Sequence, residues 1–302
     1  MIPEQEFDRE GSLDVNRFVI GIGSQRAGST LLHHALEMSS DIFMHPLKEL
    51  HYFDTLHGVR SQEALRDFSL RQLGREIDRV VGSEKLDFLD ARYRCYLRSN
   101  RILGMSSVSE VSYIDLFRPF VGRSPLLGEV TPEYMLLGDD AIRAMSEVVG
   151  KDAVIILICR NPVKRVLSAV KLMSTYNGLN FDDQRAREWL LRMLETPNPW
   201  LQAQDGYNDY PGTIRRYQAS FQCVVPIAYD RMKTDPAGVA IDIATVGDIK
   251  VDLHAFVAAT RELKNDLGRG FVVGSDIETL LAERYQQQLQ QAQQRLGHEL
   301  TQ

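Results

Sequence analysis

A glycine-rich turn between an apolar run and an amphipathic stretch is the feature that most constrains this chain. Residues 18–22 are apolar and mostly β-branched, which predicts a buried strand. Apolar residues recur at helical spacing over 31–38. The turn between them, residues 23–30, holds two glycines, one arginine and two adjacent hydroxyls. Such a strand-turn-helix unit aims backbone N–H groups and a helix dipole at one point, which favours a phosphate site over a plain tight turn.

This turn has the spacing of a nucleotide-triphosphate loop but lacks the lysine of that loop. Gly23 and Gly28 stand five residues apart, yet Ser29 occupies the position that needs lysine. A kinase or ATPase also needs an aspartate after a later strand to help hold magnesium. The best later strand, residues 153–159, is followed by Arg160. The turn is therefore P-loop-like without the ATPase machinery, and a P-loop-like nucleotide kinase is the disfavoured alternative.

Charge and apolar content exclude several classes of protein. A net charge of −6 argues against general affinity for nucleic acids, although it leaves room for a local basic cleft. No apolar segment has the pattern of a signal peptide or the length of a membrane span, which predicts a cytoplasmic protein. We interpret Cys95, Cys159 and Cys223 as reduced thiols, and the histidines show no metal-binding spacing.

Alternating strand and helix patterns predict an α/β fold with a parallel sheet flanked by helices. The 302 residues, of which 44% are hydrophobic, suit a single domain over 1–302. Residues 58–105 are charged and helical in pattern, which predicts an inserted helical segment or lid that shapes a binding pocket. Pro226 indicates that the last strand lies at a sheet edge. Four strands beyond the first are expected, within residues 41–44, 126–134, 153–159 and 223–229.

Five motifs at the expected strand ends together resemble a known enzyme family. They resemble the sulfotransferases that use 3′-phosphoadenosine 5′-phosphosulfate (PAPS), most closely the heparan sulfate 3-O-sulfotransferases and their bacterial relatives. The resemblance covers residues 18–54 and 106–298. It implies transfer of a sulfuryl group from PAPS, release of 3′-phosphoadenosine 5′-phosphate (PAP), and no metal. The motifs are GSQRAGST, KELHYFD, GEVTPEY, RNPVKRVLSAV and IAYDRMKTDP.

The resemblance also implies which residues bind the donor. Arg160 and Ser168 match the family's 3′-phosphate motif, and ordinary surface and helix positions are the alternative. Arg26 replaces the family's loop lysine, so it would stabilise the leaving group by charge and not by donating a proton. Gly268, Arg269 and Gly270 resemble the last cofactor loop, for which a plain turn is the alternative. The 5′-phosphosulfate loop is Ser24, Gln25, Arg26, Ala27, Gly28, Ser29 and Thr30.

Transfer to a hydroxyl needs a general base near this loop, and the KELHYFD motif supplies candidates. By the resemblance Glu49 is the base, with His51 two residues on and on the same side of an extended chain. His51 as the base, with Glu49 orienting it, is the alternative. Lys48 is expected to bind the acceptor or the sulfonate.

The GEVTPEY motif departs from the family pattern at one position. Val130 stands where the heparan enzymes have a lysine, so any transition-state role of that lysine must be absent or supplied elsewhere. Glu129 and Thr131 then become candidates for contacts to the acceptor. Packing at the end of the strand is the alternative for both residues.

The sequence indicates less about the acceptor than about the donor. An acidic chain favours a small-molecule, lipid or saccharide hydroxyl, and less readily an amine, over a polyanionic glycosaminoglycan. No nucleic-acid partner and no membrane span are expected. A non-catalytic nucleotide-binding protein descended from such an enzyme is a further alternative.

Overall fold

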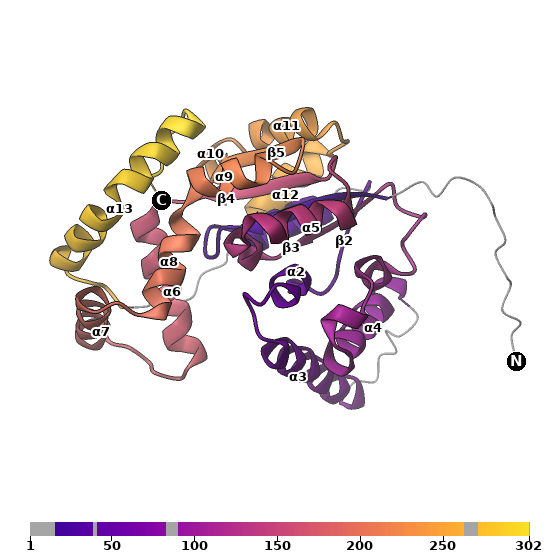
Figure 1. Cartoon of the computed structure of the whole chain (residues 1–302), viewed down its shortest axis with the longest axis horizontal. Helices are drawn as coiled ribbons and strands as arrows, with labels where there is room; N and C mark the ends of the chain where they lie inside the picture. The colour runs from indigo at the N-terminus through magenta and orange to yellow at the C-terminus, as the bar shows by residue number, and fades with distance from the viewer. Residues whose placement is uncertain (1–15, 39–40, 83–89, 263–270, 302) are drawn as a thin grey trace, which may run out of the picture.

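A five-stranded, entirely parallel sheet forms the centre of the fold (Figure 1). The computed structural model describes residues 16–38, 41–82, 90–262 and 271–301. The order β2-β3-β1-β4-β5 places β1, which ends at Gly23, next to β4, which Arg160 follows. Pro226 lies in the edge strand, as predicted. The strands are β1 Arg17–Gly23, β2 Ile42–Met44, β3 Leu126–Val130, β4 Val154–Cys159 and β5 Cys223–Ala228.

Helices cover both faces of the sheet because successive residues of each buried strand point to opposite sides. In β1, Phe18, Ile20 and Ile22 join one hydrophobic core, whereas Val19 joins the other. The first core includes residues of α5 and α9, and the second includes residues of α1, α11 and α12. These helices are α1 Ser29–Glu37, α5 Asp139–Val149, α9 Tyr210–Gln218, α11 Pro236–Gly247 and α12 Leu253–Glu262.

Two further groups of helices extend away from the sheet (Figure 1). Helices α6, α7 and α13 share a third hydrophobic core, which includes Leu190 and Tyr285. Helices α3 and α4 pack on each other within the segment predicted to be helical. The glutamine-rich helix α13 carries an apolar stripe that is buried or half-buried: Leu281, Tyr285, Leu289, Ala292 and Leu296. The bounds are α2 Tyr52–Leu56, α3 Gln62–Val81, α4 Ala91–Met105, α6 Pro162–Tyr176, α7 Asp183–Glu195, α8 Pro199–Asn208, α10 Arg231–Thr234 and α13 Ser275–Leu296.

Short 3-10 turns lie on either side of β3 in the chain: η2 and η3 precede it, and η4 follows it. The turn η4 matters most for the site because it follows β3 directly and carries the second half of the GEVTPEY motif. The predicted fold class is thus confirmed: a parallel α/β sheet flanked by helices, with an inserted helical segment. No helix in the described part of the chain combines the length and apolar character needed to cross a membrane. The turns are η2 Val108–Glu110, η3 Tyr113–Phe117 and η4 Pro132–Leu136.

Candidate functional site

The turn between β1 and α1 is a tight loop whose base is tied to the sheet. The Ser24 N–H donates to the Ile158 carbonyl at 3.0 Å, and its hydroxyl donates to the Tyr207 carbonyl at 2.7 Å. Gly28 has a left-handed backbone with φ of 96°, and a Cβ there would lie 2.8 Å from the Tyr229 ring. Glycine is therefore required at this position both by conformation and by space.

The second half of the loop lines a cavity of about 460 Å³, within the size range of ligand pockets. The cavity also borders α6, the end of β5 and residues 271–273. Of the predicted loop residues, Arg26, Gly28, Ser29 and Thr30 line it. Because β1 and α1 meet here, the N-terminus of α1 and two hydroxyls face the cavity.

Three predicted loop residues, Ser24, Gln25 and Ala27, do not line the cavity and make hydrogen bonds within the protein. Ser24 is fully buried, with its N–H and hydroxyl both donated to carbonyls. Ala27 is also fully buried, and its N–H donates to the Ser24 carbonyl at 3.1 Å. Gln25 directs its amide to Glu133, at 3.2 Å from Nε2 to Oε1. These residues hold the loop in shape and do not line the cavity.

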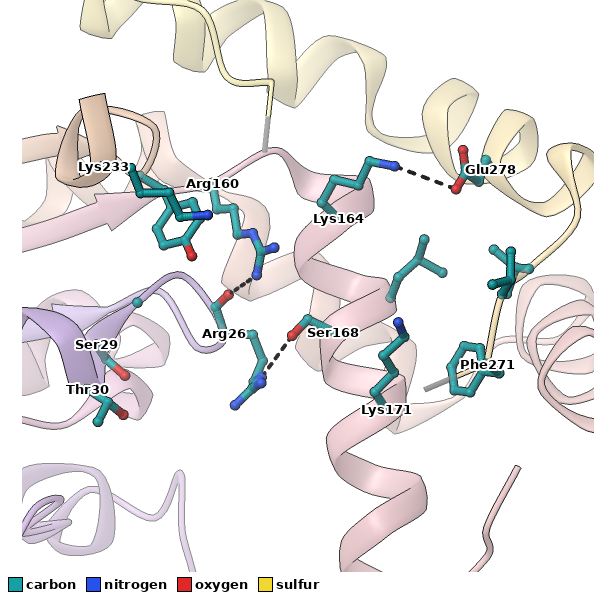
Figure 2. Close-up of a pocket in the computed structure, with 15 residues that line it drawn as sticks. Arg26, Ser29, Thr30, Arg160, Lys164, Ser168, Lys171, Lys233, Phe271 and Glu278 are labelled. Atoms are coloured by element: carbon teal, nitrogen blue, oxygen red, sulfur yellow. Dashed lines mark hydrogen bonds and ion pairs between the residues drawn. The ribbon is translucent and has the colours of Figure 1, made fainter. Parts of the chain in front are cut away.

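Both residues of the predicted 3′-phosphate motif line the same cavity as the loop (Figure 2). Arg160 donates from Nη1 to the Arg26 carbonyl at 2.8 Å. Arg26 donates from Nε to the Ser168 hydroxyl at 3.1 Å. Arg26 therefore contacts both Arg160 and Ser168, so the predicted 5′-phosphosulfate loop and the predicted 3′-phosphate residues meet at one cavity.

Positive charge dominates this cavity although the chain as a whole is acidic. Burial lowers the pKa of Arg26, and the neighbouring charge of Arg160 lowers it further. Burial likewise lowers the pKa of Arg160, whose Nε is buried without a hydrogen-bond partner. Within the described part of the chain neither guanidinium has a carboxylate ion-pair partner. A bound anion would therefore offset the free-energy cost of burying these two charges. The charged lining residues are Arg26, Arg160, Lys164, Lys171, Lys233 and one carboxylate, Glu278.

Several lining residues were not predicted from the sequence. Lys164 and Lys171 flank Ser168 at positions i−4 and i+3 on α6, so one helix face carries all three. Figure 2 shows them above and below Ser168 along this face. The helical spacing would have revealed them. Phe271, with the Lys171 ammonium 5.6 Å from its ring centroid, gives no comparable signal because it comes from a distant segment.

Arg165, on α6, is a fully buried cation behind the loop. It donates to the Asn208 side chain at 2.6 Å, to Gln204 at 3.0 Å and to the Gln25 carbonyl at 3.5 Å. All three partners are neutral, and burial lowers the pKa of Arg165. This guanidinium therefore braces the loop from inside the protein and adds positive potential beneath it.

The predicted base Glu49 lies in a cluster of charged groups next to the loop. Its carboxylate pairs with the Lys48 ammonium at 3.0 Å and with His51 Nε2 at 3.3 Å. His51 Nδ1 in turn pairs with the buried Asp54 at 2.8 Å. The Lys48 ammonium also reaches the Ser29 hydroxyl at 3.5 Å, which joins this cluster to the cavity. Glu49 is thus placed beside the loop, with 28% of its side chain exposed.

Charges within the cluster set the ionisation of its members. Burial raises the pKa of Glu49, but the charges of Lys48 and His51 lower it more, to about 2. Burial lowers the pKa of His51, but its contacts with Asp54 and Glu49 raise it more, to about 10. At neutral pH the cluster therefore holds an ionised Glu49 and an imidazolium whose two nitrogens both face carboxylates.

His51 reaches this position through a turn and not through the extended chain that the sequence predicted. Its backbone is left-handed, with φ of 53°, and it is the residue that precedes α2. Because the chain turns there, the imidazole can lie between Glu49 and Asp54 while α2 begins at Tyr52.

Glu129 and Thr131, the predicted acceptor contacts, are buried side chains with structural hydrogen bonds. Glu129 is 1% exposed and accepts from the hydroxyls of Tyr113, Tyr134 and Thr131 at 2.7–2.8 Å. Thr131 is fully buried, and its hydroxyl accepts from the Leu50 N–H at 3.1 Å. The geometry favours the packing alternative: the pair anchors the backbone that carries Glu49.

We expect Thr131→Val to destabilise the protein by about 1–3 kcal/mol and to lower kcat with little change in PAP affinity. Valine has the same shape but leaves the Leu50 N–H and a Glu129 oxygen unpaired. Urea denaturation and calorimetry would measure the two effects, with the exposed Thr245→Val as the matched control. Wild-type stability in Thr131→Val would contradict the anchoring role.

One predicted segment cannot be placed. Gly268, Arg269 and Gly270 lie outside the described residues. Phe271, the next residue along the chain, lines the cavity.

The chain is similar to sulfotransferases in sequence and in fold. A profile of the sulfotransferase family matches residues 18–252. A sulfotransferase from Alicyclobacillus acidocaldarius is 18% identical, with a TM-score of 0.58, and the match covers 94% of this chain and 96% of that one. The sulfotransferase domain from the curacin biosynthetic pathway is 15% identical, with a TM-score of 0.51, covering 95% and 99%. Both structures show a shared fold. No protein of curated function matches the sequence.

Proposed function

Because the chain belongs to the sulfotransferase family, we propose that it transfers a sulfuryl group from PAPS to the hydroxyl of a small-molecule, lipid or saccharide acceptor. The observation that carries this proposal is the single basic cavity that Arg26, Arg160 and Ser168 share, with Glu49 beside its loop. A donor with phosphate groups at both ends suits two guanidiniums that line one cavity and that have no carboxylate partner among the described residues.

The donor can be assigned to the cavity from the chemistry of its lining. The N-terminus of α1, with Ser29 and Thr30, suits the 5′-phosphosulfate. Arg160 and Ser168 suit the 3′-phosphate. The apolar residues of the lining offer a surface for the adenine ring. They are Leu167, Phe271, Val272 and Val273.

The proposed reaction is an in-line displacement at sulfur. The acceptor oxygen forms a bond to sulfur as the bond between sulfur and the phosphate oxygen breaks, and PAP leaves with that electron pair. Arg26 and the α1 N-terminus stabilise the charge that develops on the leaving phosphate. Glu49 takes the proton that the acceptor hydroxyl loses as the new bond forms.

Glu49 suits the role of base better than His51 in this geometry. The imidazole is 3% exposed, and both of its nitrogens already face carboxylates. A charged imidazole cannot accept a proton, whereas the Glu49 carboxylate is ionised and partly exposed. We therefore assign His51 to orienting Glu49, supported in turn by Asp54.

The acceptor is proposed to bind on the side of the cluster that faces α3. Phe68 of this helix lies against His51, with ring centroids 6.1 Å apart. Arg60, just before α3, lies over the same Phe68 ring at 5.9 Å. These contacts support the proposal that the helical segment expected over residues 58–105 shapes the acceptor pocket.

A labelled-donor assay tests the proposal. The protein, sulfur-labelled PAPS and a panel of alcohols, sterols, saccharides and amines are expected to yield PAP and a product heavier by one sulfonate. EDTA should not reduce the rate, because sulfuryl transfer needs no metal. Phosphorylation from a magnesium nucleotide would instead indicate a kinase. PAP binding without turnover on any acceptor class would favour the non-catalytic alternative.

A further inference from the structure

Glu133, at the end of the GEVTPEY motif, lies in the charged cluster although the sequence did not single it out. It is carried by η4, directly after β3, and 15% of its side chain is exposed. Its Oε1 accepts from Gln25 Nε2 at 3.2 Å, which ties it to the loop of the basic cavity. Its Oε2 is buried without a hydrogen-bond partner, 3.8 Å from His51 Nδ1.

A buried carboxylate oxygen without a hydrogen-bond partner is costly, and the groups around Glu133 Oε2 show what could satisfy it. One oxygen of Glu133, one of Glu49 and a ring nitrogen of His51 all lie within 4.8 Å of one another. The hydrogens of His51 are directed to Glu49 and Asp54, so none is left for Glu133. A proton is small enough to reach this oxygen without opening the structure.

We propose, resting on the proposed function, that Glu133 holds the acceptor's proton after Glu49 has taken it and releases it to solvent before the next turnover. Glu133 acts here through Glu49 and does not contact the donor. The oxygen that lacks a partner is the one that takes the proton.

The proton balance has three steps. The acceptor O–H bond breaks and its proton binds a Glu49 oxygen. The proton then passes to Glu133 Oε2 through one bridging water molecule, since the ligand atoms of the two carboxyl groups lie within 4.8 Å of each other. Glu133 finally loses it to solvent water, which can reach the partly exposed side chain although Oε2 itself is buried, and both residues return to carboxylates. No oxidant, reductant or metal is needed.

The ionisation of the groups around Glu133 agrees with this role. Burial raises the pKa of Glu133, and the charge of Glu49 raises it further. The charge of His51 lowers it, and the pKa of Glu133 is about 7. Asp54 also raises it, and Tyr207 is a further titratable neighbour, with a pKa raised far above neutrality by burial. Because Glu49 is a much stronger acid, a proton on Glu49 moves downhill to Glu133.

A pH profile of kcat is the kinetic test. Glu133 must be ionised to receive a proton, so wild-type kcat should rise through a midpoint near pH 7 to a plateau about tenfold higher. Glu49 stays ionised and His51 stays charged over this range, so neither contributes a rise. Glu133→Gln should give a flat profile at the low-pH rate of the wild type. Glu133→Asp should restore a pH-dependent rise, and the exposed Glu147→Gln should match the wild type.

Difference infrared spectroscopy tests the same carboxyl without donor or acceptor. A protonated-carboxyl band should titrate near pH 7 in the wild type and in Glu147→Gln, and be absent from Glu133→Gln. Persistence of the band, or of the kinetic rise, in Glu133→Gln would overturn the proposal. If the band behaves as expected but PAPS is never consumed, the proposed function fails instead, so the two failures are distinguishable.

Discussion

Glu49→Gln is expected to lower kcat by about 100-fold or more while PAP affinity stays within about threefold of the wild type. Glutamine keeps the shape of the side chain, and its single amide oxygen can still accept from Lys48 or His51, but it cannot take the acceptor's proton. The donor site should be little changed, because Glu49 does not line the basic cavity. Turnover of PAPS and calorimetric titration of PAP measure the two quantities on the same preparation.

Two controls separate loss of the base from damage to the site. Glu147→Gln removes an exposed carboxylate from α5 and should leave kcat unchanged. In Glu49→Ala, added formate should restore part of the rate, since a small carboxylate can occupy the vacated space and accept the proton. Wild-type kcat in Glu49→Gln would remove Glu49 from the mechanism.

Arg160→Ala is expected to weaken PAP binding by about 10- to 100-fold and adenosine 5′-phosphate binding far less. The two ligands differ only in the 3′-phosphate, so the difference between their losses isolates that contact. Arg160 has a partly buried guanidinium without a carboxylate partner in the described structure, so its charge is available to the ligand. Calorimetry with each ligand measures both losses.

The loop contact of Arg160 calls for a second variant. Arg160 also donates to the Arg26 carbonyl, so the alanine variant loses both a charge and a support of the loop. Arg160→Gln keeps a donor but removes the charge, and it should lose PAP affinity nearly as strongly as Arg160→Ala. The exposed Arg143→Ala serves as the control. Equal losses for the two ligands would contradict the 3′-phosphate assignment.

The family and the fold class were predictable from the sequence, and the match over residues 18–252 confirms the resemblance. The strand-loop-helix unit is local, so its apolar run, glycines and helical spacing suffice to predict it. The carboxyl ends of parallel strands meet at one sheet edge, so motifs that follow strands fall near one another. Arg26 and Arg160 both follow strands in this way, and both line one cavity.

The sequence did not predict which of the candidate side chains are buried or which way they point. Glu129 and Thr131 follow the strand rule equally well, yet contacts from η3 and η4 bury them. Arg165 has the sequence context of a surface helix residue, but α8 covers it. The role of each side chain therefore depended on which distant segment packs over it.

The sequence by itself determined the local elements, the order of the motifs and the residues of the first loop that we propose to bind phosphate, because each depends on residues near in the chain. Only the tertiary structure decided that Glu133 joins Glu49 and that Phe271 closes the cavity against α6. These placements depend on packing between segments far apart in the chain, and no local pattern of residue types encodes that packing.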